Sequence, residues 1–457
     1  MHLVRRFRAL RRAGHLTAVV LCLASSGVLA DAQILPMRER ATVIDDWLAD
    51  RVETVLPGLM RRAGIDLWVI ISREYNEDPV IRTMLPATWQ SARRRTILMI
   101  HDPGADQPLE TLAIARYDVG STFQKAWDKE LHGDQWNRLA DLIAERDPES
   151  IGLNYSDTFA LADGISHTEF KLFTEALDAS LRERIVSAEA LAIGWLETRS
   201  DLEMAVYPQI VRIAHEILAE GLSETVIQPG ITTTNDVAWW YRDRIRGRKL
   251  TAWFHPSVSL QRASEPELDT KASVATRHDD NVIRPGDLLH VDLGITYLRL
   301  NTDTQQHAYV LRPGETSPPD DLVRAFERGN RLQDILTSQF VAGRSGNDIL
   351  ARALRQAERE NITASIYTHP LGYHGHGAGP TIGLWDQQGG VPGRGDYPLY
   401  PKTAHSIELY AESEVPSWNR KVRIKLEEDA FFDGESTWYL DGRQREMYLI
   451  PRRPALQ

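Results

Sequence analysis

Cysteine is almost missing from this sequence: only one of the 457 residues is a cysteine, and it stands at position 22. A single thiol excludes an internal disulfide, an iron–sulfur cluster and a cysteine-based zinc site. Long hydrophobic runs are also missing after residue 30, because none reaches the roughly 18 residues that a membrane-spanning helix needs. We therefore expect no membrane span once the first thirty residues are removed.

The signatures of several common hydrolases are missing as well. There is no GxSxG stretch, which argues against an α/β-hydrolase. His215 in "HEILAE" lacks the second histidine of HExxH, which disfavours a single-zinc protease, and no GxxxxGK loop is present to cradle a phosphate. The net charge of −11 argues against binding to nucleic acid.

The first thirty residues have a composition of their own. The segment "MHLVRRFRALRRAGH" carries five arginines and no acidic residue, and "LTAVVLCLASSGVLA" is an apolar run that ends in small residues. A basic start, a short apolar run and an A-x-A-like end are typical of a secretory signal peptide. We predict a signal peptide over residues 1–30, cleavage after Ala30 or Ala32, and a periplasmic or secreted protein.

The remaining chain predicts two domains of mixed α/β class. Helical and strand patterns alternate over residues 37–190, which is typical of an α/β domain. Ser200 and Glu203 then form an S-x-x-E capping box that opens a long amphipathic helix, and we expect Pro208 to kink it. Strands dominate from residue 250 onward, so a second domain is predicted over residues 195–451.

Acidic residues stand inside the apolar strands of this second domain. Asp292 lies in "HVDLGITYL" and Asp303 follows eleven residues later, so a hairpin would bring both carboxylates to one face. Glu408 lies in "HSIELY", another apolar strand. Glu427 and Glu428 end a third strand, and strand alternation turns only one of them inward. Buried carboxylates are rare unless they are paired or bind a metal.

A histidine-rich stretch lies between these strands. "HPLGYHGHGAG" places His369, His374 and His376 within eight residues, among glycines that let the backbone come close to a ligand. Two aspartates and two glutamates supply a charge of −4, which matches two divalent cations. Oxygen ligands with an imidazole suit Mn²⁺, Co²⁺ or Zn²⁺ better than copper. Two such ions can share a water molecule, lower its pKa and polarise a carbonyl group.

The order of these pieces resembles the pita-bread metallopeptidases, a family that includes aminopeptidase P, prolidase and creatinase. The resemblance rests on five pieces in a fixed order. They are Asp292, Asp303 eleven residues later, His376 between two glycines, Glu408 after an isoleucine in a strand, and the run "RIKLEED" that contains Glu427. It covers about residues 195–450, and residues 37–190 look like the creatinase-type N-terminal domain of the same family. The implied fold is an α/β (α+β) protein with these two domains.

The resemblance also implies roles for single residues. It makes Asp292 a ligand of one metal ion, Asp303 and Glu427 bridging ligands of both, His376 the metal-binding histidine, and Glu408 a ligand and the general base. His369 and His374 become candidates for stabilising the tetrahedral intermediate. His255 and His278 compete for the place of a substrate-binding histidine upstream of the first aspartate. Trp385 stands where the family carries a further histidine.

The implied activity is removal of the N-terminal residue from Xaa-Pro peptides, or cleavage of Xaa-Pro dipeptides. The implied cofactor is a pair of divalent metal ions, with manganese expected first and cobalt or zinc as alternatives. A homodimer is an option, since family members are often dimers. Two other functions stay open: a creatinase-like C–N hydrolase acting on a non-peptide substrate, and a catalytically silent peptide-binding homologue.

Overall fold

The computed structural model describes residues 34–104, 107–263 and 281–452. From Leu35 onward the chain forms one compact unit. The predicted signal peptide, residues 1–30, lies outside the described residues, and so does His278.

A six-stranded sheet with the order β4-β3-β2-β1-β5-β6 organises the first part of the described chain. Its strands are β1 (Leu67–Arg73), β2 (Arg95–His101), β3 (Glu110–Ala113), β4 (Gln124–Lys125), β5 (Ile151–Leu153) and β6 (Ile185–Ser187). Strand β1 pairs antiparallel with β2 and parallel with β5. Along β1, Leu67, Val69 and Ile71 enter one hydrophobic core, while Trp68 and Ile70 enter another. The sheet is therefore covered on both faces.

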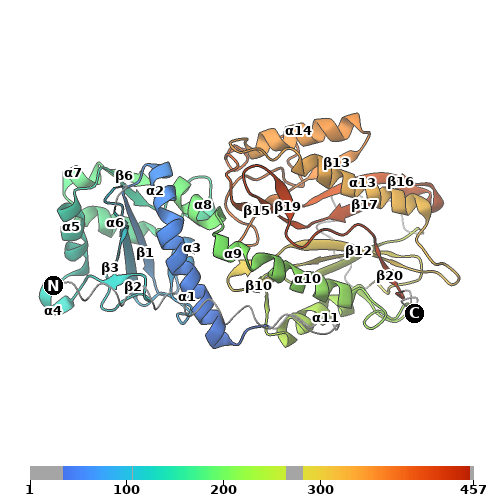
Figure 1. The fold of residues 1–457 in the computed structure, drawn as a ribbon, viewed down its shortest axis with the longest axis horizontal. Coiled ribbons are helices and arrows are strands. Elements are labelled where there is room, and N and C mark those ends of the chain that lie inside the picture. Colours follow the sequence, from blue (N-terminus) through green and yellow to red (C-terminus); the bar gives the residue numbers. More distant parts are fainter. Residues whose placement is uncertain (1–33, 105–106, 264–280, 453–457) are drawn as a thin grey trace, which may run out of the picture. The chain divides into compact units, whose positions relative to one another are not determined.

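The helices of this part divide between the two faces of the sheet (Figure 1). They are α1 (Met37–Thr54), α2 (Leu56–Ala63), α3 (Pro79–Met84), α4 (Lys129–His132), α5 (Gln135–Arg146), α6 (His167–Ala176), α7 (Ala179–Arg182) and α8 (Glu189–Glu197), with a 3-10 turn at Ala160–Ala162. Residues of α1, α2 and α8 pack in the core that contains Trp68, whereas residues of α5 and α6 pack in the core that contains Val69.

Smaller sheets make up the second part of the chain. Their strands are β7 (Thr251–Ala252), β8 (Ser257–Gln261), β9 (Leu288–Leu293), β10 (Ile295–Tyr297), β11 (Leu300–Asn301), β12 (Thr304–Val310), β13 (Thr363–Ile366), β14 (His369–Leu371), β15 (Thr403–Ser406), β16 (Leu409–Val415), β17 (Arg420–Leu426), β18 (Asp429–Phe432), β19 (Thr437–Tyr439) and β20 (Tyr448–Ile450). They form the orders β20-β12-β9-β8, β13-β16-β17, β14-β15-β18-β19 and β11-β10-β7. The predicted mixed α/β class is confirmed.

Helices accompany these sheets, and Figure 1 shows α13 and α14 beside β13, β16 and β17. The helices are α9 (Asp201–Met204), α10 (Tyr207–Gly221), α11 (Thr234–Gly247), α13 (Asp320–Thr337) and α14 (Gly346–Arg359), with a 3-10 turn at Pro416–Trp418. The capping box of Ser200 and Glu203 is confirmed. The single long helix predicted after it is wrong, because α9 ends at Met204. Pro208 stands in the first turn of α10, where its missing N–H breaks no helical hydrogen bond.

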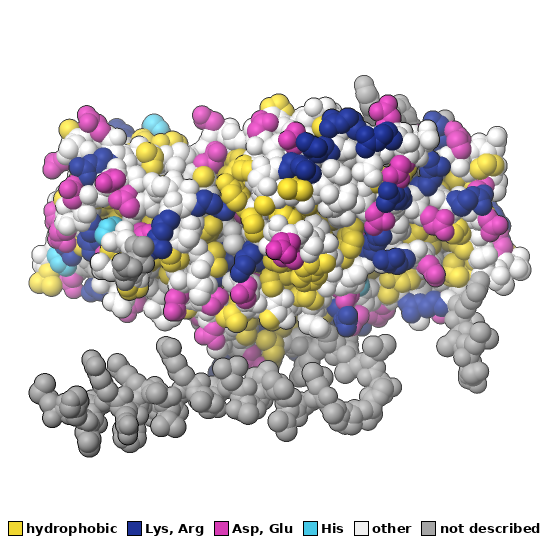
Figure 2. Space-filling view, turned by 45° about the horizontal axis from the view of Figure 1, so that its top comes forward, with side chains coloured by type: hydrophobic (Ala, Val, Ile, Leu, Met, Phe, Trp, Pro, Cys, Tyr) yellow, Lys and Arg dark blue, Asp and Glu magenta, His cyan; other side chains and the backbone are white. Residues whose placement is uncertain are grey.

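The surface mixes charges of both signs. Figure 2 shows basic and acidic side chains scattered over one face of the molecule, with hydrophobic side chains between them. Within the described ranges, no helix combines the length and apolar character that crossing a membrane requires.

Candidate metal centre

The acidic residues singled out in the sequence lie where strands end or change sheets. Asp292 is near the end of β9, and Asp303 directly precedes β12, which pairs antiparallel with β9. Glu408 stands in the break between β15 and β16, which belong to different sheets, and Glu427 stands in the break between β17 and β18. A break in the pairing frees these positions from the regular ladder, so all four carboxylates can turn toward one point.

The structure brings these carboxylates together with two of the three histidines. The ligand atoms lie within 4.8 Å of one another in three groups: Asp303, His369 and His376; His369, Glu408 and Glu427; and Asp292, Asp303 and Glu427. Asp303 and Glu427 each occur in two of these groups, as bridging ligands would. The predicted cluster of Asp292, Asp303, His376, Glu408 and Glu427 is therefore assembled in space, with His369 as an additional member.

His369 carries the test of whether a metal ion fits. Its Nδ1 lies 3.1 Å from the carbonyl oxygen of Pro370, which can only accept, so Nδ1 carries a proton, and in the neutral ring Nε2 is the nitrogen that can bind a metal ion. This Nε2 is buried without a hydrogen-bond partner. It lies 3.6 Å from carboxylate oxygens of Asp303 and Glu427 and 3.9 Å from one of Glu408.

A lone pair facing carboxylate oxygens is repulsive unless a cation lies between them. Two atoms that ligate one ion, each at about 2.0–2.2 Å, stand roughly 3–4 Å apart. The spacing around His369 Nε2 meets this requirement, so the donor set fits a divalent metal ion.

The electrostatics of the carboxylates agree with a site for cations. Burial raises the pKa of Asp303 well above its ordinary value, and the neighbouring Glu427, Asp292 and Glu408 raise it further. Burial, Glu427 and Asp292 likewise raise the pKa of Glu408. Like charges in a low-dielectric site keep protons unless a cation replaces them. The cluster is therefore arranged to exchange protons for metal ions.

Neighbouring polar groups hold these carboxylates in place. Ser406 donates its hydroxyl to Glu427 Oε1 at 2.6 Å. The backbone N–H of Asp303 donates to the carboxylate of Asp429 at 3.2 Å. Gln305 donates its amide to both Glu408 and Glu427. Glu428 turns the other way and contacts His215 at 2.8 Å, as the alternation of neighbouring strand residues requires.

The histidines singled out in the sequence have different surroundings. His376 packs its ring 4.7 Å from that of His369 and 5.2 Å from that of Trp253; its side chain is exposed at the surface, and partial desolvation lowers its pKa. His374 belongs to none of the groups above. Burial lowers its pKa to about 4, and the charges of Arg82 and Arg199 lower it further, so it faces cations rather than the carboxylates.

Only His255 of the two candidates for a substrate-binding histidine lies among the described residues, and it is not part of the wall of the cavity at the centre. His255 stacks at 4.9 Å on Trp239, whose side chain is 56% exposed. His278 lies outside the described residues. On β8, the positions opposite Asp292 and His290 are Ser257 and Ser259, so serines face the centre from this strand.

A cavity of about 700 Å³ opens onto the carboxylates and onto His369 and His376. Its wall includes a basic group consisting of Arg394, Arg423 and Lys425, together with Trp385 and Asp386 from the loop after Thr381. The residue that stands in place of a family histidine, Trp385, is thus at the cavity. A volume of this size accommodates a small ligand or a short peptide.

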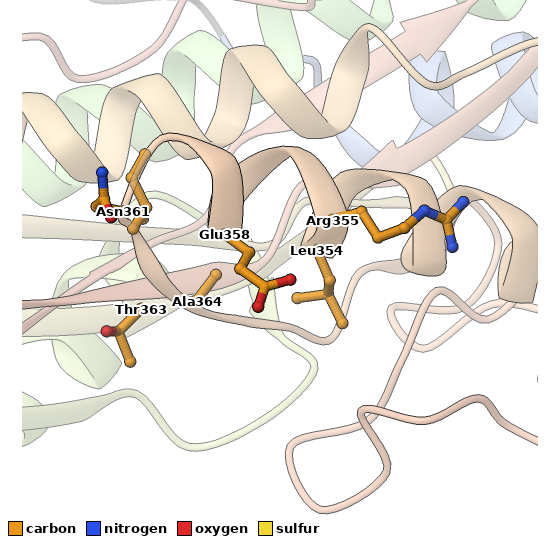
Figure 3. Close-up of a pocket in the computed structure, with 7 residues that line it drawn as sticks. Leu354, Arg355, Glu358, Asn361, Thr363 and Ala364 are labelled. Atoms are coloured by element: carbon orange, nitrogen blue, oxygen red, sulfur yellow. The ribbon is translucent and has the colours of Figure 1, made fainter.

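Another cavity, of about 570 Å³, lies between the end of α14 and the start of β13. Figure 3 shows its lining, with Arg355 extending away from Glu358. Its lining residues include no histidine and only one carboxylate, so it offers no set of metal ligands.

Three features of the centre were not predicted from the sequence. His369 was expected to act on the intermediate rather than among the ligands, and Gln305 and Lys425 were not singled out. A signal for Gln305 was present in the sequence, because the polar residues "TQQH" open a predicted strand. In the structure all residues of this strand are buried. Buried amides in a strand require partners, and here the partners are metal-ligand candidates.

The comparisons with known proteins agree with this geometry. Residues 209–430 match the model of metallopeptidase family M24. No curated protein sequence matches the chain. The fold is similar to that of an X-Pro aminopeptidase from Thermotoga maritima, with 18% identity, a TM-score of 0.60, and coverage of 86% of this chain and 99% of that one.

Other solved structures show the same likeness. An Xaa-Pro dipeptidase from Bacillus anthracis has 17% identity and a TM-score of 0.58 over 91% of this chain and 100% of its own. A variant of aminopeptidase P from Escherichia coli has 12% identity and a TM-score of 0.58 over 90% of this chain and 97% of its own. At these identities the likeness shows a shared fold, and the matched segment shows the family. Residues 209–430 therefore form a metallopeptidase family M24 domain, as the resemblance to the pita-bread metallopeptidases predicts.

Proposed function

We propose that the protein is an exported dinuclear-metal peptidase that hydrolyses the N-terminal peptide bond of Xaa-Pro substrates. The match of residues 209–430 to metallopeptidase family M24 supports the coarser function, a metal-dependent peptidase. The observation that carries the proposal is the buried Nε2 of His369, which has no hydrogen-bond partner and lies among the oxygens of Asp303, Glu408 and Glu427. Solved proteins of the same fold include an X-Pro aminopeptidase and an Xaa-Pro dipeptidase.

The donor set supports two divalent ions. Asp303 and Glu427 would hold both ions, Asp292 and Glu408 would each serve one, and His369 and His376 would supply nitrogen. When bound, such ions activate water and polarise the carbonyl of the scissile bond. Four carboxylates with one or two imidazoles suit Mn²⁺, with Co²⁺ and Zn²⁺ as alternatives.

Glu408 is the residue best placed to move a proton. Its side chain is 17% exposed and lines the cavity, whereas that of Glu427 is 1% exposed. A general base must reach the water that attacks the substrate. We assign proton transfer to the carboxylate of Glu408, which accepts a hydrogen bond from Gln305.

The basic group in the cavity wall supports a short peptide as substrate. Lys425 is close enough to Asp292 and Glu408 for their charges to oppose the lowering of its pKa by burial. Arg423 pairs with Glu412 at 3.2 Å. Arg394 is exposed at the cavity, in the loop after Thr381. A free carboxylate at the far end of a dipeptide or tripeptide would complement this charge.

Export is a separate part of the proposal. It is supported by the basic start and the apolar run of residues 1–30 and by the single cysteine within that segment. Mass spectrometry of the protein expressed from the full gene tests this part, because a new N-terminus at residue 31 or 33 is expected.

The test of the peptidase activity uses this protein stripped of metal and reloaded with Mn²⁺, Co²⁺ or Zn²⁺. Matched Xaa-Pro and Xaa-Ala peptides, dipeptides and longer ones, are assayed beside Asp303→Ala. Metal-dependent cleavage that prefers proline and disappears in the variant is expected. Metal binding without cleavage of any peptide would refute the peptidase proposal and favour a C–N hydrolase or a silent binding protein.

A further inference from the structure

Gln305 touches both glutamates of the candidate metal centre. It lies in β12 opposite Asp292 of β9, and its side chain is buried. Its backbone also pairs with that of Glu427: the N–H of Gln305 donates to the carbonyl of Glu427 at 3.0 Å, and the N–H of Glu427 donates back at 3.2 Å. The main chain at this point is therefore fixed from two sides.

The amide of Gln305 uses both of its N–H bonds on carboxylates. Nε2 donates to Glu408 Oε1 at 2.5 Å and to Glu427 Oε2 at 2.7 Å. Neither of these oxygens is the one that lies nearest to His369. Glu408 Oε2 and Glu427 Oε1 are the atoms that face His369 Nε2, at 3.9 Å and 3.6 Å. The amide thus occupies one oxygen of each glutamate, and the other oxygen lies on the His369 side, where Glu427 Oε1 also accepts from Ser406 at 2.6 Å.

His290 determines which way the amide points. Its Nε2 lies 2.8 Å from Gln305 Oε1, and an amide oxygen can only accept, so His290 Nε2 carries the proton. Its Nδ1 is then an acceptor for the hydroxyl of Ser259 at 3.3 Å. Turning the amide over would place its oxygen against two carboxylates and its NH₂ group against an N–H. The chain Ser259–His290–Gln305 therefore permits one orientation.

We propose that Gln305 is a positioning residue that fixes which oxygen of Glu408 and of Glu427 is presented to the metal ions, and that His290 locks its amide. Without the amide, either glutamate can rotate and offer both oxygens to one ion. This inference rests on the proposed function, because it requires that the centre binds metal. It adds a specific consequence: both glutamates bind through one oxygen at the His369 side of the centre.

The test compares Co²⁺ binding by the full protein and three variants, using titration calorimetry and the visible absorption of the bound ion. Gln305→Met removes the amide at similar length, and His290→Phe removes its lock. Gln306→Met is the matched control, because Gln306 is the next buried glutamine and donates at 2.9 Å to Glu428, which faces away from the centre. Circular dichroism verifies folding, and His290→Phe carries the test if Gln305→Met does not fold.

We expect Gln305→Met to weaken Co²⁺ binding by about 10- to 100-fold, the usual cost of removing a group that supports a ligand. Its absorption spectrum should also change, because the coordination number changes. His290→Phe should shift both quantities in the same direction by less, and Gln306→Met should leave the spectrum unchanged. Wild-type affinity and spectrum in the folded Gln305→Met protein would overturn the inference.

The outcomes separate this inference from the proposed function. If the wild-type protein binds Co²⁺ but cuts no peptide, the peptidase proposal fails while the spectral test of Gln305 still decides the inference. If the wild-type protein cuts peptides and Gln305→Met binds Co²⁺ as the wild type does, only the inference fails. If the wild-type protein binds no Co²⁺, both fail.

Discussion

Two groups of buried charges in this protein differ in whether their carboxylates contact oppositely charged side chains. At the junction after α8, Glu203 lies between Arg51, at 2.8 Å, and Arg199, at 3.3 Å, and all three side chains are fully buried. Arg51 also donates to the carbonyl oxygen of Thr198 at 2.6 Å. Burial raises the pKa of Glu203, but the two arginines outweigh this and hold it below its ordinary value.

The carboxylates of the candidate metal centre are less balanced, because the charge of Lys425 acts on Asp292 and Glu408 while four carboxylates stand together. Asp303 and Glu408 are pushed toward their protonated forms by burial and by one another, and the lone pair of His369 points at their oxygens. The comparison teaches that burial and charge alone do not identify a site. A buried cluster with opposite charges stabilises the fold, whereas a buried cluster of one sign requires a ligand.

The largest expected effect on activity comes from Asp303→Asn, which removes a carboxylate from the candidate metal centre. Activity should fall more than about 100-fold, because loss of a supporting group alone costs 10- to 100-fold. The metal-free variant should nevertheless unfold at the same or a higher temperature than metal-free wild type, because a buried Asn needs neither a bound proton nor a counter-charge. Thermal unfolding with and without Mn²⁺, together with a peptide assay, measures both. A metal-free variant that is clearly less stable would contradict the account.

The corresponding exchange at Glu203, which lies between Arg51 and Arg199, should lower the stability of the protein. Glu203→Gln leaves two buried guanidinium groups without a counter-charge, so we expect a loss of about 3–5 kcal/mol in the free energy of unfolding. Urea denaturation measures it, with Glu360→Gln as a control at the surface pair with Arg331, where no change is expected. A stability equal to wild type would show that the two clusters are not different in kind.

A third buried carboxylate sharpens the comparison, because it is only partly compensated. Burial raises the pKa of Glu197 to about 8, against an ordinary value of 4.5, although Arg62 lies 3.7 Å away. The folded protein keeps this proton at a pH where the unfolded chain has released it. Its contribution to stability is therefore complete below pH 4.5 and is lost as the pH rises to about 8.

The expected slope from Glu197 is about −1.4 kcal/mol per pH unit over that window. In Glu197→Gln this part of the pH dependence should vanish, and the variant should be more stable than wild type at pH 8. Unfolding free energies at pH 5, 6.5 and 8 measure the difference between the two proteins. Parallel pH profiles would show that Glu197 is ionised in the folded protein.

The smallest effect is expected at His374. This histidine faces Arg82 and Arg199 rather than the carboxylates, so His374→Gln should change activity by less than about threefold. The matched exchange His369→Gln removes a ligand candidate and should cost at least about tenfold. Peptide assays of both variants at saturating Mn²⁺ compare them. Equal losses would contradict the different positions that the two side chains occupy.

The sequence allowed the carboxylates of the centre to be predicted, because acidic residues inside apolar strands are conspicuous and their order resembles a known family. It did not show that the strand containing Glu408 breaks at that residue, since the break depends on pairing with other sheets. Which histidine faces the cluster was also beyond local pattern. His369 is placed by the pairing of β14 with β15, where it lies opposite Ser406.

Glu203 and Gln305 show the same limit of prediction from local sequence. The capping box of Ser200 and Glu203 follows from spacing along the chain and is confirmed. That Glu203 also pairs with Arg51, 152 positions away, depends on tertiary packing. Gln305 is similar: its strand could be predicted from the apolar pattern, but its contacts with residues more than 100 positions away could not.

The most direct test of the account is the crystal structure of the protein soaked in Mn²⁺, with anomalous diffraction used to locate the metal ions. We predict two peaks a few ångströms apart, both within ligand distance of Asp303 and Glu427, and at least one within ligand distance of His369 Nε2. No peak in the cluster, or peaks held by other residues, would contradict the account.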